Sequence, residues 1–164
     1  MIGGLAVICV GEPRTTGDAD VIAFLDSDGA ESLLVKAKKA GYKLDLKAER
    51  KSLNETGTFC IRRGPFQLDV LLASLPFEDE AYRRASTLKL FGRRLKLPTP
   101  EDLILLKVLA GAEKDMMDAA GVVRRHGAKL DRRYIEATLR PICDLAEDMG
   151  PWVRLQQVLG RSSR

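Results

Sequence analysis

The stretch GGLAVICVGEPRTTGDAD, residues 3–20, ends on two carboxylates, Asp18 and Asp20, that stand one residue apart. Successive side chains of an extended strand point to opposite faces, so Asp18 and Asp20 would project from the same face. Two like charges held that close need a cation. Mg²⁺ is the natural one, with Mn²⁺ as its substitute, because both take hard carboxylate ligands. The end of this stretch therefore predicts a strand that carries a metal site.

A third carboxylate, Asp69, lies in the run FQLDVLLA, residues 66–73. It alternates with apolar residues, which are Phe66, Leu68, Val70 and Leu72. An acid in so apolar a run is costly to bury unless it is paired or liganded. We expect Asp69 on a strand beside that of Asp18 and Asp20, so that three acids bracket one or two metal ions. The alternatives are a turn formed by Asp18 with Gly17, and an exposed sheet edge for Asp69.

The start of the chain admits two structures. Leu5–Val10 is apolar throughout, which fits a buried strand or a buried helix equally well. If a helix opens at Gly3 and Gly4, their backbone amides and the helix dipole can hold a phosphate. The alternative is that the glycine pair only permits tight packing.

Composition indicates an ordinary globular protein. The chain has 164 residues, 45% hydrophobic and 30% charged, enough for one domain with its own core. No apolar run approaches the roughly 18 to 20 residues that cross a bilayer, and the first residues lack the positive start of a secretion signal. We therefore expect a cytoplasmic protein that contacts no membrane.

Cysteines and cations add little to the functional prediction. Cys9, Cys60 and Cys143 are odd in number and lie in apolar stretches, which predicts reduced core thiols and neither a disulfide frame nor a zinc site. The formal charge is +4, and the basic residues form doublets along the whole chain. Because a nucleic-acid footprint needs such charges gathered on one face, we interpret the doublets as solvated surface.

The pattern of elements predicts an α/β (α+β) fold. Strand-like runs cover residues 20–25, 57–63, 66–73 and 87–97, with a turn at Arg63–Pro65, and favour a mixed or mostly antiparallel sheet. Helices are expected at residues 30–40 and 77–85, and from Thr99 onward, where Thr99 caps a first turn with Pro100. Pro141 and Pro151 are expected to divide the remainder into shorter helices. Residues 1–98 would form the mixed-sheet core and residues 99–164 a helical part packed on it, as a single domain.

Several segments together carry a family resemblance. They are Gly3–Val7, Gly11–Asp20, Pro98–Ile104, Leu106–Lys107 and Ala110–Asp118. This combination resembles the DNA polymerase beta-like nucleotidyltransferases, and within them the minimal branch that contains abortive-infection toxins of the AbiEii kind. The matches cover roughly residues 1–125.

The resemblance implies a polymerase-beta-like fold, a mixed sheet flanked by helices, in which Leu5–Val10 is helical. It assigns metal binding to Asp18, Asp20 and Asp69, with Lys107 and Lys114 completing the catalytic set. It assigns nucleotide binding to Gly3, Gly4, Arg14, Thr16, Lys107, Lys114 and Asp118. Offsets of 7 and 11 residues from Lys107 return to one side of a helix at about 100° per residue, provided the helix continues through Gly111. The alternative for Lys114 and Asp118 is a surface ion pair.

The implied reaction is transfer of a nucleotide from a nucleoside triphosphate to an acceptor hydroxyl, with release of pyrophosphate and two metal ions in the site. The acceptor could be a tRNA, a protein or a small molecule, and a toxin–antitoxin role is compatible with the resemblance. A competing interpretation is a catalytically silent nucleotide-binding or regulatory, antitoxin-like protein. A third is a basic RNA-binding module. A homodimer and a complex with a partner protein are both compatible with the sequence.

Overall fold

The computed structural model describes residues 1–90 and 92–160. It has the predicted mixed α/β class, with a helical C-terminal part. The chain divides into two compact units, and each is described by itself. Unit 1 is Met1–Leu5 and Thr15–Glu80, and unit 2 is Ala6–Arg14 and Ala81–Arg164. Helices α1 (Gly3–Val10) and α4 (Pro76–Arg84) run from one unit into the other. The predicted division near residue 98 stays a prediction.

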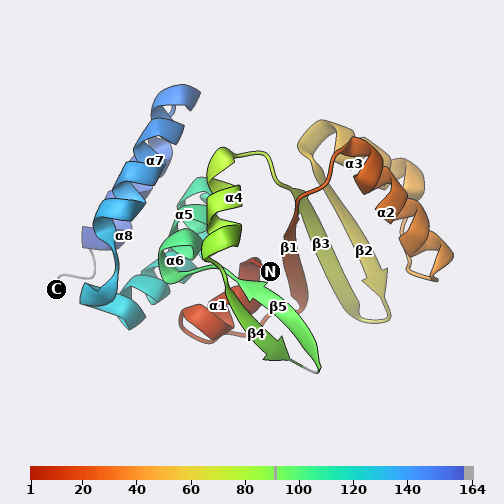
Figure 1. Cartoon of the computed structure of the whole chain (residues 1–164), viewed down its shortest axis with the longest axis horizontal. Helices are drawn as coiled ribbons and strands as arrows, with labels where there is room; N and C mark the ends of the chain where they lie inside the picture. Colours follow the sequence, from red (N-terminus) through yellow and green to blue (C-terminus); the bar gives the residue numbers. More distant parts are fainter. Residues whose placement is uncertain (91, 161–164) are drawn as a thin grey trace. The chain divides into compact units, whose positions relative to one another are not determined.

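Unit 1 contains a three-stranded sheet of β1 (Asp18–Ala23), β2 (Thr58–Arg63) and β3 (Phe66–Leu72). The strand order is β1-β3-β2, with β1 parallel and β2 antiparallel to β3, so the prediction of a mixed sheet is confirmed. Helices α2 (Ser27–Lys39) and α3 (Leu46–Thr56) cover one face (Figure 1). The core between them is built from the residues Ala30, Leu34, Ala37, Leu53, Phe59, Ile61 and Val70.

Local sequence explains where the helices of unit 1 begin and end. Asp26 caps α2 by accepting a hydrogen bond from the Gly29 amide at 2.8 Å. Asp45 caps α3 in the same way, and α3 ends at Gly57, whose φ of 67° favours glycine. The sequence did not predict α3, because its only buried residue is Leu53 and the rest of it is mostly polar.

Unit 2 contains a hairpin and a group of helices. Strands β4 (Ser86–Leu90) and β5 (Arg93–Leu97) pair only with each other among the described residues. The predicted single strand at 87–97 is therefore wrong, because the chain turns back near Gly92, whose φ is 73°. The helices are α5 (Pro100–Ala110), α6 (Glu113–His126), α7 (Arg132–Ala146) and α8 (Gly150–Gly160), with a short 3₁₀ turn at Gly127–Lys129.

Two predictions about the helical part are wrong. Gly111 adopts a φ of 75° and ends α5, so no continuous helix joins Lys107 to Lys114. Pro141 lies inside α7 and does not divide it, since the buried face of Ile135, Leu139 and Cys143 holds the helix together across it. By contrast, the predicted cap is confirmed, because Thr99 accepts a hydrogen bond from the Asp102 amide at 3.2 Å.

Two further predictions concern cysteines and membranes. All three cysteines are free thiols, as expected, but only Cys143 is buried in the core, while Cys60 is half-buried and Cys9 is exposed. Within residues 1–90 and 92–160, no helix combines the length and the apolar character that crossing a bilayer requires.

Candidate functional site

The register of the sheet places three carboxylates on one face. Asp20 is directly paired with Asp69, and Asp18 with Gln67, across the parallel strands β1 and β3. Side chains of directly paired residues point to the same face, so Asp18, Asp20 and Asp69 share it. The opposite face carries Val70 and packs against α2 and α3. Because β3 is the central strand, the alternative that placed Asp69 at a sheet edge is wrong.

Asp69 is held by two neutral donors on this face. The Gln67 Nε2 atom lies 3.0 Å from both carboxylate oxygens of Asp69. Burial, followed by the hydrogen bond to Asp69 and the charge of that carboxylate, raises the pKa of Cys60 to about 11. The thiol is therefore protonated at neutral pH and donates to Asp69. The sequence analysis assigned no role to Gln67 or Cys60, although Gln67, two residues before Asp69, had to share its face.

The start of α1 lies against Asp20. Gly3 has a φ of 65°, and a Cβ atom there would lie 1.7 Å from the Asp20 Oδ2 atom. The Ile2 amide donates to the Asp20 carbonyl at 2.8 Å. A Cβ atom at Gly4 would lie 2.5 Å from the Oγ1 atom of Thr16, whose hydroxyl donates to the Asp18 carbonyl at 3.2 Å. Unit 1 therefore brings both predicted glycines and Thr16 beside the strand that carries the acidic pair.

The three acids fit a divalent cation by chemistry and by register. Among residues 1–90 and 92–160, none of them forms an ion pair with a lysine or an arginine. As the side chains lie, no group of three or more His, Cys, Asp or Glu residues in this part of the chain is arranged to hold a metal. Rotation of Asp side chains between staggered positions would be needed to gather the carboxylates around one ion. Together, Asp18, Asp20 and Asp69 are named here the acidic face.

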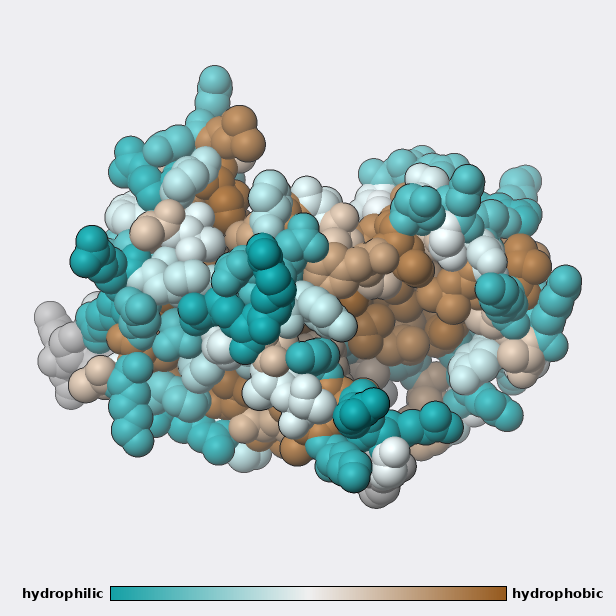
Figure 2. Space-filling view, in the orientation of Figure 1, coloured by the Kyte–Doolittle hydropathy of each residue, from teal (hydrophilic) through white to brown (hydrophobic). Residues whose placement is uncertain are grey.

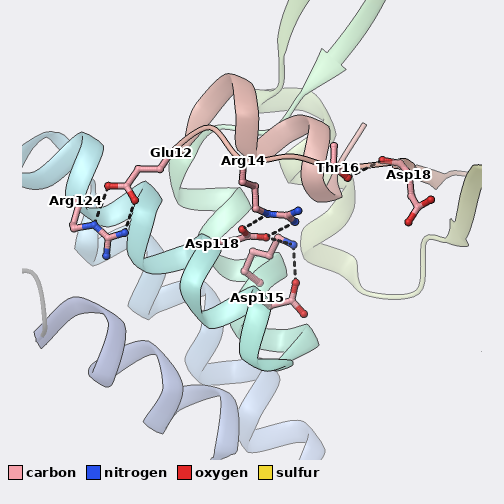
Figure 3. A network of polar contacts seen from close by, with 8 residues as sticks. Glu12, Arg14, Thr16, Asp18, Asp115, Asp118 and Arg124 are labelled. Carbon is pink, nitrogen blue, oxygen red and sulfur yellow. Dashed lines mark hydrogen bonds and ion pairs between the residues drawn. The ribbon is translucent and has the colours of Figure 1, made fainter.

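Unit 2 gathers another set of predicted residues into a buried ion cluster. The Lys107 Nζ atom lies 2.6 Å from the Asp115 Oδ1 atom and 3.1 Å from the Asp118 Oδ2 atom. Arg14 donates to both oxygens of Asp118, at 2.7 and 3.0 Å (Figure 3). Lys107, Asp115 and Asp118 are only 6%, 7% and 5% exposed, so these charges balance one another away from water. These four residues, Arg14, Lys107, Asp115 and Asp118, are named here the ion cluster.

The cluster fixes the charge of Asp118 and excludes Lys114. Burial alone would raise the pKa of Asp118, but the hydrogen bonds from Arg14 and Lys107 outweigh it and lower that pKa. The alternative pair between Lys114 and Asp118 is absent from the described residues, and Lys114 is exposed. Sequence analysis missed Asp115 because it assumed a helix running through Gly111. The prediction that the ion cluster and the acidic face complete one site stays a prediction.

A pocket of about 410 Å³ adjoins the ion cluster within unit 2. Its two cations are both engaged by acids, Arg14 by Asp118 and Arg124 by Glu12, whose Oε1 atom accepts from the Arg124 Nε atom at 2.9 Å (Figure 3). Its lining is completed by Pro13, Glu113, Met116, Met117, Ala120 and Gly121. The pocket thus offers little uncompensated charge to a triphosphate.

Comparison with models of known protein families gives no match, and comparison with curated proteins gives none either. Among solved structures, the chain is similar to the crystal structure of an antigenic nucleotidyltransferase-like protein from Paracoccidioides brasiliensis. The two share 17% sequence identity with a TM-score of 0.45, over 94% of this chain and 82% of that one. The AbiEii-like branch stays a prediction.

Proposed function

We propose that the chain is a metal-dependent nucleotidyltransferase that moves a nucleoside monophosphate from a nucleoside triphosphate to an acceptor hydroxyl. The observation that supports this most is the acidic face: three carboxylates on adjacent strands, without a cationic partner in the described residues, beside the start of α1. A protein keeps such uncompensated like charges together at a cost to stability, which a bound cation would remove.

In this proposal Asp18, Asp20 and Asp69 hold the cation. Bound Mg²⁺ supplies neutralisation of phosphate charge and a lower pKa for the acceptor hydroxyl. Asp69 accepts the proton of that hydroxyl, whose oxygen forms a bond to the α-phosphorus while the bond from phosphorus to the leaving oxygen breaks and pyrophosphate departs. The first amides of α1, at Gly3 and Gly4, have no partner within the helix and would donate to phosphate oxygens. Further candidates for triphosphate binding are Arg14, Thr16, Lys107, Lys114 and Asp118.

A second candidate is a catalytically silent, regulatory or antitoxin-like protein. Two observations favour it: no three-ligand group is formed by the described side chains as they lie, and Lys107 is occupied by two aspartates. Such a protein would bind a nucleotide without turning it over.

Metal titration separates these candidates most directly. Mn²⁺ binding, followed by electron paramagnetic resonance, should be strong for the full chain and lost in Asp69→Asn. Asp28→Asn is the matched control, because Asp28 is an exposed acid of unit 1 on α2. An equal loss in both variants, or no Mn²⁺ binding at all, would contradict the metal site.

Turnover is tested with each α-labelled nucleoside triphosphate, Mg²⁺ and either tRNA or protein as acceptor. Label transfer with pyrophosphate release that Asp69→Asn abolishes supports the enzyme, whereas nucleotide binding without release supports the silent candidate. A toxin–antitoxin role predicts growth arrest on expression that the same variant relieves.

A further inference from the structure

A second charged region belongs to the hairpin of unit 2. Between Glu80 and Glu101 the sequence has no acidic residue and six basic ones, which are Arg83, Arg84, Lys89, Arg93, Arg94 and Lys96. Four of these six lie on β4 and β5. So long a basic stretch without an acid gives the hairpin a strong positive charge, although the whole chain carries only +4.

The register collects most of this charge on one face. Lys89 is directly paired with Arg94, and Thr87 with Lys96, while Leu88 is paired with Leu95 on the other face. Directly opposed like charges destabilise an antiparallel pair. The hairpin therefore has an arrangement that its own folding does not favour, and a face of Thr87, Lys89, Arg94 and Lys96 without a large apolar residue.

The cations of the hairpin differ in what they contact. Arg84, before the hairpin, is engaged inside unit 2: it stacks on Tyr134 at 3.8 Å and pairs with the buried Asp102. Lys89, Arg93 and Arg94 are exposed, and none of them forms an ion pair with the described part of the chain. Figure 2 shows hydrophilic side chains around the hairpin in the lower middle of the view. These three cations are open to a partner from solution.

We infer that the β4–β5 hairpin binds the phosphodiester backbone of a nucleic acid. Cations on a two-stranded ribbon can contact successive phosphates, and release of counterions from the nucleic acid drives the association. An acidic membrane fits less well, because surface-bound elements add apolar side chains to their basic face and this face has none. The surface does not depend on the proposed transfer reaction, so binding is measured in EDTA.

Fluorescence anisotropy with the full chain tests this inference, using a labelled RNA stem-loop and a DNA duplex of the same sequence. The variant Lys89→Gln with Arg94→Gln removes two charges from the hairpin face. The matched control, Arg132→Gln with Arg133→Gln, removes two exposed charges from the first turn of α7. At about 0.15 M salt, loss of two phosphate contacts should weaken binding about 30-fold and reduce the salt slope by about 1.8.

The control variant should retain its affinity within a factor of about 3, because it leaves the hairpin face intact. Tighter binding of RNA or of DNA would then identify which source supplies the backbone. Equal loss in the two variants, no loss in the hairpin variant, or no binding by the unaltered chain would overturn the inference. Binding to vesicles that contain phosphatidylserine, without binding to either nucleic acid, would replace it with a membrane surface. Thermal melts confirm that both variants fold.

Discussion

The acidic face of unit 1 and the ion cluster of unit 2 use the same residue types in opposite ways. In the ion cluster, Asp118 has two cations within 3.1 Å and little exposure to water. On the acidic face, Asp20 and Asp69 are directly paired neighbours, and Asp69 is held by the neutral donors Gln67 and Cys60. The cluster is internally balanced, whereas the face lacks a cation among the described residues.

This difference separates a structural role from a ligand-binding role. Buried charges with complete partners hold a fold together, and removal of one partner is strongly destabilising. Like charges without partners contribute no stability of their own, so their arrangement fits a ligand that carries the opposite charge. Four substitutions would break or sharpen this distinction.

The largest effect is expected at the centre of the ion cluster. Lys107→Met would leave Asp115 and Asp118 buried without the cation they share, which should lower the free energy of unfolding by about 3–5 kcal/mol. Urea denaturation measures this change. Lys114→Met is the control, because Lys114 is exposed and should change stability by less than about 0.5 kcal/mol. If the two variants lose the same stability, the cluster is not the balanced structural element described above.

The next effect concerns the start of α1 against the acidic face. Gly3→Ala would place a methyl group 1.7 Å from the Asp20 Oδ2 atom, at a residue whose φ is 65°. The left-handed backbone and the forced shift of Asp20 should lower the free energy of unfolding by about 2–3 kcal/mol. They should also weaken Mn²⁺ binding. Gly17→Ala has open space around it and should be nearly neutral in both measurements. Unaltered Mn²⁺ binding in Gly3→Ala would remove Asp20 from the metal site.

The acidic face was predictable from the sequence, since period-two alternation placed Asp18 with Asp20 and set Asp69 against the apolar residues of its strand. The pairing of Asp20 with Asp69 was expected only as neighbouring strands. Its register was not, because register depends on the packing of residues such as Val70 against α2 and α3.

The ion cluster was predicted for a wrong reason. Helical spacing through Gly111 placed Lys107 and Asp118 on one side, but the helix ends there and the two residues meet across the turn between α5 and α6. Asp115 entered the cluster for the same reason. The residue that the sequence left most open was Arg14, because it reaches Asp118 across 104 positions of the chain.

A smaller effect follows from the lowered pKa of Asp118. Because this pKa is lower in the folded than in the unfolded state, the ion cluster contributes stability above the unfolded pKa and loses it as pH falls through the folded pKa. Asp118→Asn should reduce stability at neutral pH but flatten its further loss toward about pH 3. Urea midpoints at the two pH values measure this. An equally steep acid loss in the variant would assign it to other carboxylates.

The smallest effect concerns the hairpin, where unit 2 departs from its own charge balance. Lys89→Thr removes a like-charge pair with Arg94 and should raise the free energy of unfolding by about 0.2–0.5 kcal/mol. Since threonine also favours strands, a double-mutant cycle with Arg94→Thr isolates the repulsion from the gain in strand propensity. A repulsive coupling that salt weakens would show that the folded hairpin retains charges it would be more stable without. Absence of coupling would mean that the two cations diverge in solution, and the hairpin would then resemble the balanced ion cluster more than the acidic face.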